Sequence, residues 1–216
     1  LALELTYRCP LKCSWCSNPL DFEDYAALEL STDEWRRVMR EARALGSLQV
    51  GFTGGEPLQR KDLEELVAYA EEIGLYSNLI TSGVGLSEER LIALKQVGLK
   101  QIQLSMQSTE AALTDELVGA KAHLLKLEAA RLIKAHGFPM VLNMPVGRQN
   151  ITQVGAMIDY AAGLGAEYLE LANLQYYNWA LINREELMPS LEQVRAAEAV
   201  VQDKRAQLGK KMAIYY

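Results

Sequence analysis

Short apolar runs alternate with amphipathic windows along the chain. The apolar runs have the length and residue types of β-strands, and they are Leu1–Thr6, Leu48–Thr53, Tyr76–Thr81, Gln101–Gln107, Pro139–Val146 and Tyr168–Gln175. Apolar positions three or four residues apart predict helices between them, at Thr32–Leu45, Asp62–Ile73, Glu88–Val97, a longer segment ending at His136-Gly137, Thr152–Leu164 and Ser190–Leu208. The first of these helices would bury one face, made of Trp35, Val38, Met39, Ala42 and Leu45. Ser31 with Glu34, and Ser190 with Gln193, are spaced as capping boxes.

Six successive strand–helix units predict an α/β fold with a parallel sheet and right-handed crossovers. A closed eight-stranded barrel takes about 250 residues, and this chain has 216. We therefore expect a partial (β/α)6 TIM-like barrel, open on one side, with its chemistry at the carboxyl ends of the strands. Residues 1–211 are assigned to this domain, and Met212–Tyr216 is expected to begin a further strand that leads into a missing C-terminal extension.

The composition excludes several classes of function. The net charge is −6 and no stripe of Lys or Arg is visible, which excludes a nucleic-acid partner. No apolar run approaches the roughly 18 residues of a membrane span, and Leu1–Thr6 lacks the features of a signal peptide. These observations favour a cytoplasmic protein with no membrane partner.

The 3 cysteines of the chain, Cys9, Cys13 and Cys16, lie within eight residues on the loop after the first predicted strand. An odd, tightly spaced set does not form a disulfide framework, so metal binding is the natural interpretation. A [4Fe–4S] cluster usually takes four thiolates. The spacing C-x3-C-x2-C can supply three, which leaves one iron free to bind the amino and carboxylate groups of S-adenosylmethionine (SAM).

Two plainer interpretations compete with the cluster. A zinc site of three Cys and one His would need His123 or His136, the 2 histidines of the chain, and both lie on a distant predicted helix. Buried cysteines with no ligand role are common when they are isolated. Because three cysteines lie on one polar loop, this second interpretation is weaker than metal binding. A non-catalytic metal- or peptide-binding barrel is a more distant alternative.

The set Cys9, Cys13, Trp15 and Cys16 resembles the C-x3-C-x-aromatic-C motif of the radical SAM enzymes. The resemblance implies that Trp15 packs near the adenine of SAM, although a core aromatic that closes the loop would look the same. Gly54-Gly55-Glu56, after the second strand, is similar to the Gly-Gly-Glu motif of that family. Its glycine backbone would approach the methionyl amino group of SAM, and Glu56 would add a carboxylate.

Weaker assignments follow from the same resemblance. Ser105 would face the ribose of SAM, or alternatively would only bond the backbone at the end of a strand. Asn143 would face the same cavity if its side chain points inward.

Longer strings resemble the PqqA peptide cyclases, radical SAM enzymes of pyrroloquinoline quinone biosynthesis. These strings are Glu4–Leu11, Cys16–Leu20, Tyr76–Gly83 and Gln175–Ala180 with Asn183-Arg184. The resemblance implies carbon–carbon cross-linking of a Glu and a Tyr in the precursor peptide PqqA. It also implies two partners, the chaperone PqqD and an electron donor such as flavodoxin. A set of substrate-side residues follows, namely Asn78, Thr81, Gln175, Tyr176, Tyr177 and Trp179.

Two features depart from that family. Its members carry auxiliary iron–sulfur clusters on further cysteines in a C-terminal extension, so such clusters are expected only in a missing segment. Gly147 stands where a His is expected. A radical SAM maturase of another ribosomal peptide therefore remains the alternative.

Overall fold

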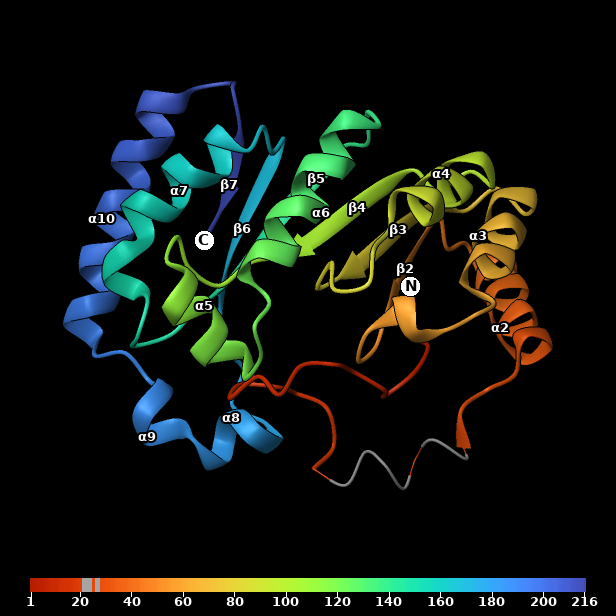
Figure 1. The fold of residues 1–216 in the computed structure, drawn as a ribbon, viewed down its shortest axis with the longest axis horizontal. Helices are drawn as coiled ribbons and strands as arrows, with labels where there is room; N and C mark the ends of the chain where they lie inside the picture. The colour runs from red at the N-terminus through yellow and green to blue at the C-terminus, as the bar shows by residue number, and fades with distance from the viewer. Residues whose placement is uncertain (21–24, 26–27) are drawn as a thin grey trace.

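The computed structural model of the chain describes residues 1–20, 25 and 28–216. A parallel sheet of seven strands, in the order β1 to β7 along the chain, forms its centre (Figure 1). The strands are β1 (Ala2–Glu4), β2 (Gln49–Thr53), β3 (Tyr76–Thr81), β4 (Gln101–Ser105), β5 (Met140–Val146), β6 (Tyr168–Asn173) and β7 (Ala213–Tyr215). Each strand pairs with the next one in sequence, so every connection returns the chain to the same end of the sheet.

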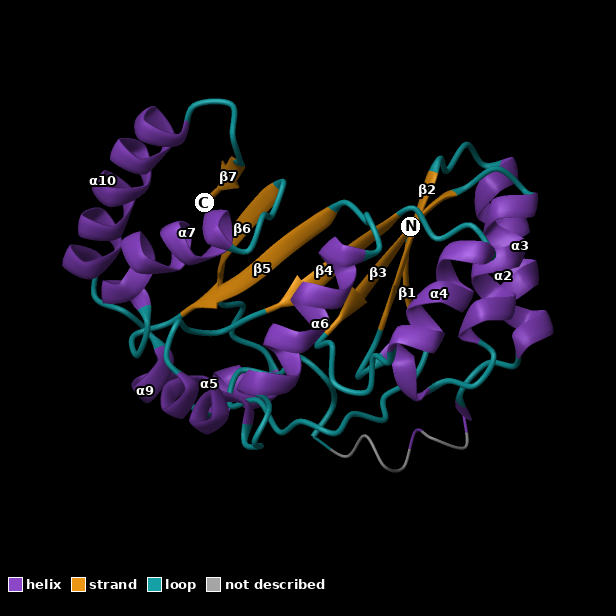
Figure 2. Cartoon of the chain, turned by 45° about the horizontal axis from the view of Figure 1, so that its top comes forward, coloured by secondary structure: helices purple, strands orange, loops and turns teal. Residues whose placement is uncertain are grey.

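Helices connect the strands and cover one face of the sheet (Figure 2). They are α2 (Thr32–Ala44), α3 (Leu63–Glu72), α4 (Glu88–Gln96), α5 (Ala111–Val118), α6 (His123–Ala135), α7 (Val154–Gly163), α8 (Asn178–Ile182), α9 (Arg184–Leu187) and α10 (Leu191–Leu208). Short 3-10 turns, η2 (Pro57–Gln59) and η3 (Ile151–Gln153), follow β2 and precede α7. Among the strand contacts, α3 packs on β3, α6 on β4 and β5, and α10 on β7.

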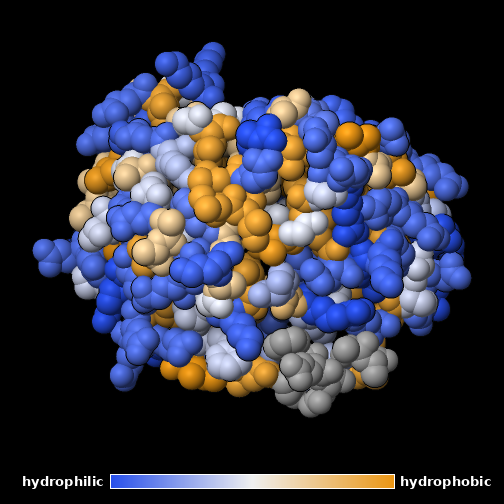
Figure 3. Space-filling view, in the orientation of Figure 1, coloured by the Kyte–Doolittle hydropathy of each residue, from blue (hydrophilic) through white to orange (hydrophobic). Residues whose placement is uncertain are grey.

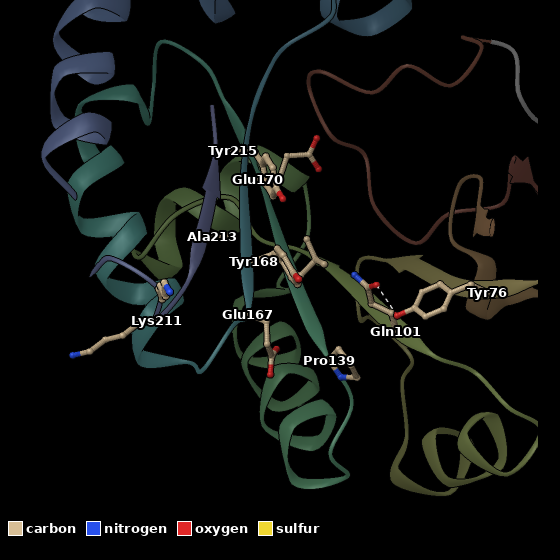
Figure 4. A pocket seen from close by; sticks show the side chains of 11 residues that line it. Tyr76, Gln101, Pro139, Glu167, Tyr168, Glu170, Lys211, Ala213 and Tyr215 are labelled. Atoms are coloured by element: carbon tan, nitrogen blue, oxygen red, sulfur yellow. Dashed lines mark hydrogen bonds between the residues drawn. The ribbon is translucent and has the colours of Figure 1, made fainter. Parts of the chain in front are cut away.

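Burial alternates along most of the strands and defines two faces of the sheet. One face, which we call the helix face, consists of buried and mostly apolar side chains such as Phe52, Leu79 and Leu142. The opposite face, which we call the lumen face, is partly exposed. It lines a cavity of about 870 Å³ through Tyr76, Gln101, Val141, Tyr168, Glu170 and Tyr215, drawn from five different strands (Figure 4). A sheet with an apolar outer face and an open concave inner face is a barrel that does not close.

The α/β partial-barrel prediction is confirmed, with local corrections. The strand at Tyr76–Thr81 has the predicted bounds, and the others are shorter at one or both ends. The segment at the chain's end forms β7, which pairs with β6 in the same sheet. The two predicted capping boxes, at Ser31 and Ser190, are present.

Three predictions about helices were wrong or incomplete. The long helix before His136 is two helices, because Gly119 adopts a left-handed φ of 66° that ends α5. Leu45 is 90% exposed and lies outside α2, so it does not belong to the buried face of that helix. The short helices α8 and α9 follow β6, where no helix was predicted.

The outer surface is mostly polar. In the view of Figure 3, charged and polar side chains cover most of the molecule, with apolar side chains in a band across its centre. Within the described residues, no helix combines the length and apolar character needed to cross a bilayer.

Candidate active site

The cysteine loop follows β1 and is held by backbone hydrogen bonds to two neighbouring segments. The Gly55 N–H donates to the Thr6 carbonyl at 2.6 Å, and the Glu56 N–H donates to the Arg8 carbonyl at 2.8 Å. Farther along the loop, the Lys12 N–H donates to the Val118 carbonyl at the end of α5, at 2.9 Å. The Gly55-Glu56 segment after β2 therefore positions the loop before Cys9, and the end of α5 positions it between Cys9 and Cys13.

Helix α8 holds the other side of the cysteine loop, although it lies about 165 residues away in sequence. The Asn183 side-chain amide donates to the Ser14 carbonyl at 2.8 Å. The Asn178 amide donates to the Ser17 carbonyl at 2.7 Å. In Figure 1 the loop (red) runs beside α8 (blue) and α5 (green). These two amide contacts place the predicted substrate-side string next to the predicted cluster ligands.

The three thiols line one cavity of about 460 Å³. It is bounded by Tyr7, Cys9, Leu11, Lys12, Cys13, Ser14, Cys16, Asn18, Trp179 and Asn183. All three cysteines are free and partly buried. Convergence of three sulfur ligands from eight consecutive residues on one cavity fits an iron–sulfur cluster, in which each thiolate binds a separate iron.

Burial dominates the chemistry of these thiols. It raises the pKa of Cys13 to about 12, and it raises the pKa values of Cys9 and Cys16 as well. The Asn18 backbone N–H, which donates to the Cys16 sulfur at 3.4 Å, acts in the opposite direction on the pKa of Cys16. Thiols in such a dry site ionise when a cationic metal centre replaces their protons.

The zinc alternative finds no support in the positions of the histidines. His123 is buried with its Nδ1 3.2 Å from the Thr114 hydroxyl, and the His136 Nε2 lies 2.9 Å from Glu88. In the part of the chain that is described, no three His, Cys, Asp or Glu side chains are grouped tightly enough for a single metal ion.

The two glycines of the Gly-Gly-Glu segment are needed for a close backbone approach. A Cβ atom at Gly54 would lie 2.3 Å from the Thr6 carbonyl oxygen, and one at Gly55 would lie 2.5 Å from the Arg8 carbonyl oxygen. Gly54 also has a φ of 133°, which L-residues rarely adopt. In this structure the space left by these glycines is filled by the backbone that leads into Cys9.

Gly55→Ala is expected to displace the cysteine loop. Overpacking of this kind costs about 1–3 kcal/mol, and here the atoms that must move belong to the backbone of Tyr7 and Arg8. The variant should bind less iron per chain after anaerobic reconstitution and should unfold at a lower denaturant concentration. Gly85→Ala is a useful control for glycine replacement, because a Cβ at Gly85 meets no atom within 4 Å, although its φ of 91° adds backbone strain of its own. Equal iron content in Gly55→Ala and the wild type would contradict the prediction.

Glu56 is completely buried, and four protein donors surround its carboxylate. Oε1 accepts from the Leu58 N–H at 3.1 Å and from the Thr81 hydroxyl at 2.6 Å. Oε2 accepts from the Ser82 N–H at 2.8 Å and from the Ser82 hydroxyl. Because a carboxylate has about four acceptor sites, Glu56 joins the loop after β2 to the loop after β3 rather than presenting a free carboxylate.

Of the residues predicted on the strands, three face the lumen and one does not. Ser105 and Asn143 are paired neighbours on β4 and β5, and Asn78 lies on the same face of β3. The Asn143 amide donates to Glu170 at 2.7 Å, and Asn78 Oδ1 has no hydrogen-bond partner among the described residues. Thr81 is on the helix face, 2% exposed, where it bonds Glu56.

The remaining predicted residues lie on the cysteine loop and in the segment that leads into α8. Trp15 is half-buried between Cys13 and Cys16. Trp179, 39% exposed, borders the thiol cavity, whereas Gln175 and Tyr177 are exposed. Tyr176 is half-buried, and burial raises its pKa while Arg184 and Arg148 lower it. Of this string, Trp179 is the residue that the structure brings to the thiols.

Sequence reasoning missed one buried charge at the site, Lys126 on α6. Its ammonium donates to the carbonyls of Ser82 and Ser105, at the carboxyl ends of β3 and β4. A signal was available, since positions 122, 126, 129, 130 and 133 form one helical stripe in which 126 is the only position that is not apolar.

Comparison with protein families agrees with this geometry. A family model described as the Radical SAM superfamily matches residues 3–161, which include the cysteine loop and β2 to β5. The chain belongs to the radical SAM superfamily. That family implies a [4Fe–4S] cluster and SAM, and the three thiols that converge on one cavity fit such a cluster.

Solved structures share the fold at low identity, and one of them, HemN, is described as a radical SAM enzyme. Streptococcus suis SuiB bound to its precursor peptide SuiA is 20% identical with a TM-score of 0.82, and the match covers 100% of this chain and 48% of SuiB. The protein anSMEcpe with bound AdoMet and the Kp18Cys peptide is 15% identical with a TM-score of 0.76, covering 99% and 62%. HemN from Escherichia coli is 13% identical with a TM-score of 0.69, covering 97% and 51%. The chain thus spans about half the length of SuiB.

Proposed function

We propose that this chain is the catalytic core of a radical SAM maturase that cross-links a Glu and a Tyr side chain in the precursor peptide PqqA. When bound, the cluster supplies the electron that cleaves SAM into methionine and a 5′-deoxyadenosyl radical, which takes a hydrogen atom from the substrate. The observation that carries the proposal is the thiol cavity bordered by Trp179, a residue of the string that resembles the PqqA peptide cyclases.

Each residue of the site has a proposed task. Cys9, Cys13 and Cys16 hold the cluster, and Gly54 and Gly55 hold their loop against β2. Glu56 fixes the loop after β3 through Thr81 and Ser82, so its contribution to SAM binding is indirect.

On the lumen side, Ser105 and Asn143 are proposed to face SAM, and Asn78 to face the peptide. Asn78 Oδ1 is a buried acceptor with no hydrogen-bond partner among the described residues. Trp15 is proposed to lie near the adenine, and Gln175, Tyr176, Tyr177 and Trp179 to border the peptide path. The exposed position of Tyr177, at 61%, suits contact with a large ligand.

Two solved structures of this fold support a peptide as the class of substrate. SuiB was crystallised with the precursor peptide SuiA, and anSMEcpe was crystallised with AdoMet and the Kp18Cys peptide. For this chain we propose PqqA as substrate, PqqD as the peptide chaperone and a flavodoxin-like electron donor in the cytoplasm. We further propose that the core domain predicted over residues 1–211 also includes β7, which pairs with β6 in the same sheet, and that auxiliary clusters belong to a C-terminal extension.

Anaerobic incubation of the reconstituted protein with SAM, a reductant, PqqA and PqqD tests this function. The expected result is 5′-deoxyadenosine together with a PqqA product that has lost two hydrogens, detected by mass spectrometry. Formation of 5′-deoxyadenosine without any change in PqqA would overturn the choice of substrate and favour a maturase of another ribosomal peptide. A protein that contains zinc without sulfide would overturn the enzyme class itself.

A further inference from the structure

Lys126 places an ammonium group in the interior of the site. The side chain is fully buried on α6, the helix that packs on β4 and β5 (Figure 2). Its Nζ donates to the Ser105 carbonyl at 2.8 Å and to the Ser82 carbonyl at 3.1 Å. Because the free energy cost of burying an unpaired charge is large, a lysine in this position needs compensation from nearby anions.

Hydrogen bonds link Lys126 to the cysteine loop through Ser82 and Glu56. The Lys126 Nζ donates to the Ser82 carbonyl, the Ser82 N–H donates to Glu56, and the Glu56 N–H donates to the Arg8 carbonyl, directly before Cys9. Burial lowers the pKa of Lys126 to about 8, and the charge of Glu56 acts in the opposite direction.

The backbone of Ser82 connects the two buried charges. The Ser82 N–H donates to Glu56 Oε2 at 2.8 Å, and the Ser82 carbonyl accepts from Lys126 Nζ at 3.1 Å. The carbonyl of Ser105, whose side chain is on the lumen face, accepts the second Lys126 bond. Lys126 is therefore fixed in direction by two carbonyls and cannot turn toward solvent.

We propose that Lys126 is a buried counter-charge that makes a cluster held by Cys9, Cys13 and Cys16 easier to reduce. This inference rests on the proposed function. Reduction adds one negative charge to the cluster, and a fixed positive charge nearby stabilises the reduced form more than the oxidised form. At the effective dielectric constant of about 20 that suits protein sites, one fixed unit charge close to the cluster is expected to change the reduction equilibrium by roughly tenfold.

The experiment measures the midpoint potential of the reconstituted cluster, without SAM, by electron paramagnetic resonance during a redox titration. Lys126→Met and Lys126→Gln both remove the charge, and Lys126→Gln keeps a hydrogen-bond donor. We expect both to shift the potential to more negative values by about 59 mV, the equivalent of a tenfold change for one electron. Lys126→Arg, which keeps the charge, should stay near the wild-type potential.

Lys121→Met is the matched control, because Lys121 lies two residues before α6 with a side chain that is 96% exposed. It should leave the potential unchanged. If Lys126→Met fails to fold, Lys126→Gln decides the question. An unchanged potential in Lys126→Gln would overturn the inference. If the same variant bound SAM more weakly, Lys126 would act in SAM binding and not in tuning the cluster potential. Failure of the wild type to assemble a cluster would instead refute the proposed function.

Discussion

Cys13→Ala should abolish assembly of the iron–sulfur cluster while leaving the fold of the apoprotein intact. Cys13 is the middle ligand of the three, and burial raises its pKa most, to about 12. Without it, two thiolates remain for a cluster that normally takes four. A buried Cys behaves as a small apolar side chain, so alanine fits the same space at little cost to packing.

Iron and acid-labile sulfide per chain, together with the paramagnetic signal of the reduced cluster, measure this effect. Ser14→Ala is the matched control, because Ser14 is the next residue of the same loop and its buried Oγ has no hydrogen-bond partner in the described part of the chain. Ser14→Ala should keep wild-type iron. Wild-type iron content in Cys13→Ala, or iron that survives replacement of all three cysteines, would contradict the cluster assignment.

Local signals in the sequence were sufficient to predict the fold and to select candidate ligands. The alternation of apolar runs and helical stripes predicted a parallel α/β sheet because each period maps onto one element, and the strand Tyr76–Thr81 was predicted to the residue. The three cysteines stood out as candidate ligands because all of them lie within eight residues. Ser31–Glu34 capping was found because its geometry depends only on the first turn of a helix.

Features that depend on contacts across the fold were missed. The split between α5 and α6 depends on Gly119. A side chain there would be crowded by the cysteine loop, because a Cβ atom at position 119 would lie 3.0 Å from the Lys12 carbonyl oxygen. The pleat of β3, which turns Thr81 to the helix face and Asn78 to the lumen, cannot be read from polarity because both side chains are polar. The contact of Asn183 with Ser14 spans 169 residues, and no local pattern predicts it.

Glu56 illustrates how tertiary contacts change the interpretation of a motif. As part of a Gly-Gly-Glu segment it was expected to give its carboxylate to SAM, yet four protein donors surround it in the structure. The same carboxylate balances the buried Lys126. The carboxylate of this motif therefore fixes the loop after β3 from the helix face of the sheet. Any contact that the backbone of the motif makes with a ligand is additional to this role.

Glu56→Gln should accordingly destabilise the apoprotein by about 1–3 kcal/mol, the cost of leaving buried hydrogen-bonding groups without a partner. The NH2 group of the new side chain would face a donor, either the Ser82 N–H or the Leu58 N–H, in place of an acceptor oxygen. Chemical denaturation of the metal-free protein measures the free energy of unfolding. Glu72→Gln, on an exposed position of α3, should stay within about 0.5 kcal/mol of the wild type.

A double variant separates the charge balance from the hydrogen bonds around Glu56. If Glu56 and Lys126 compensate each other, Glu56→Gln with Lys126→Met should cost less than the sum of the two single changes, by about 0.5–3 kcal/mol. Additive costs would mean that the four donors alone explain the effect of Glu56. The free energy of unfolding should fall further in Glu56→Gln than in Glu72→Gln. If the two variants lose the same amount, Glu56 does not fix the loop after β3 and that assignment is wrong.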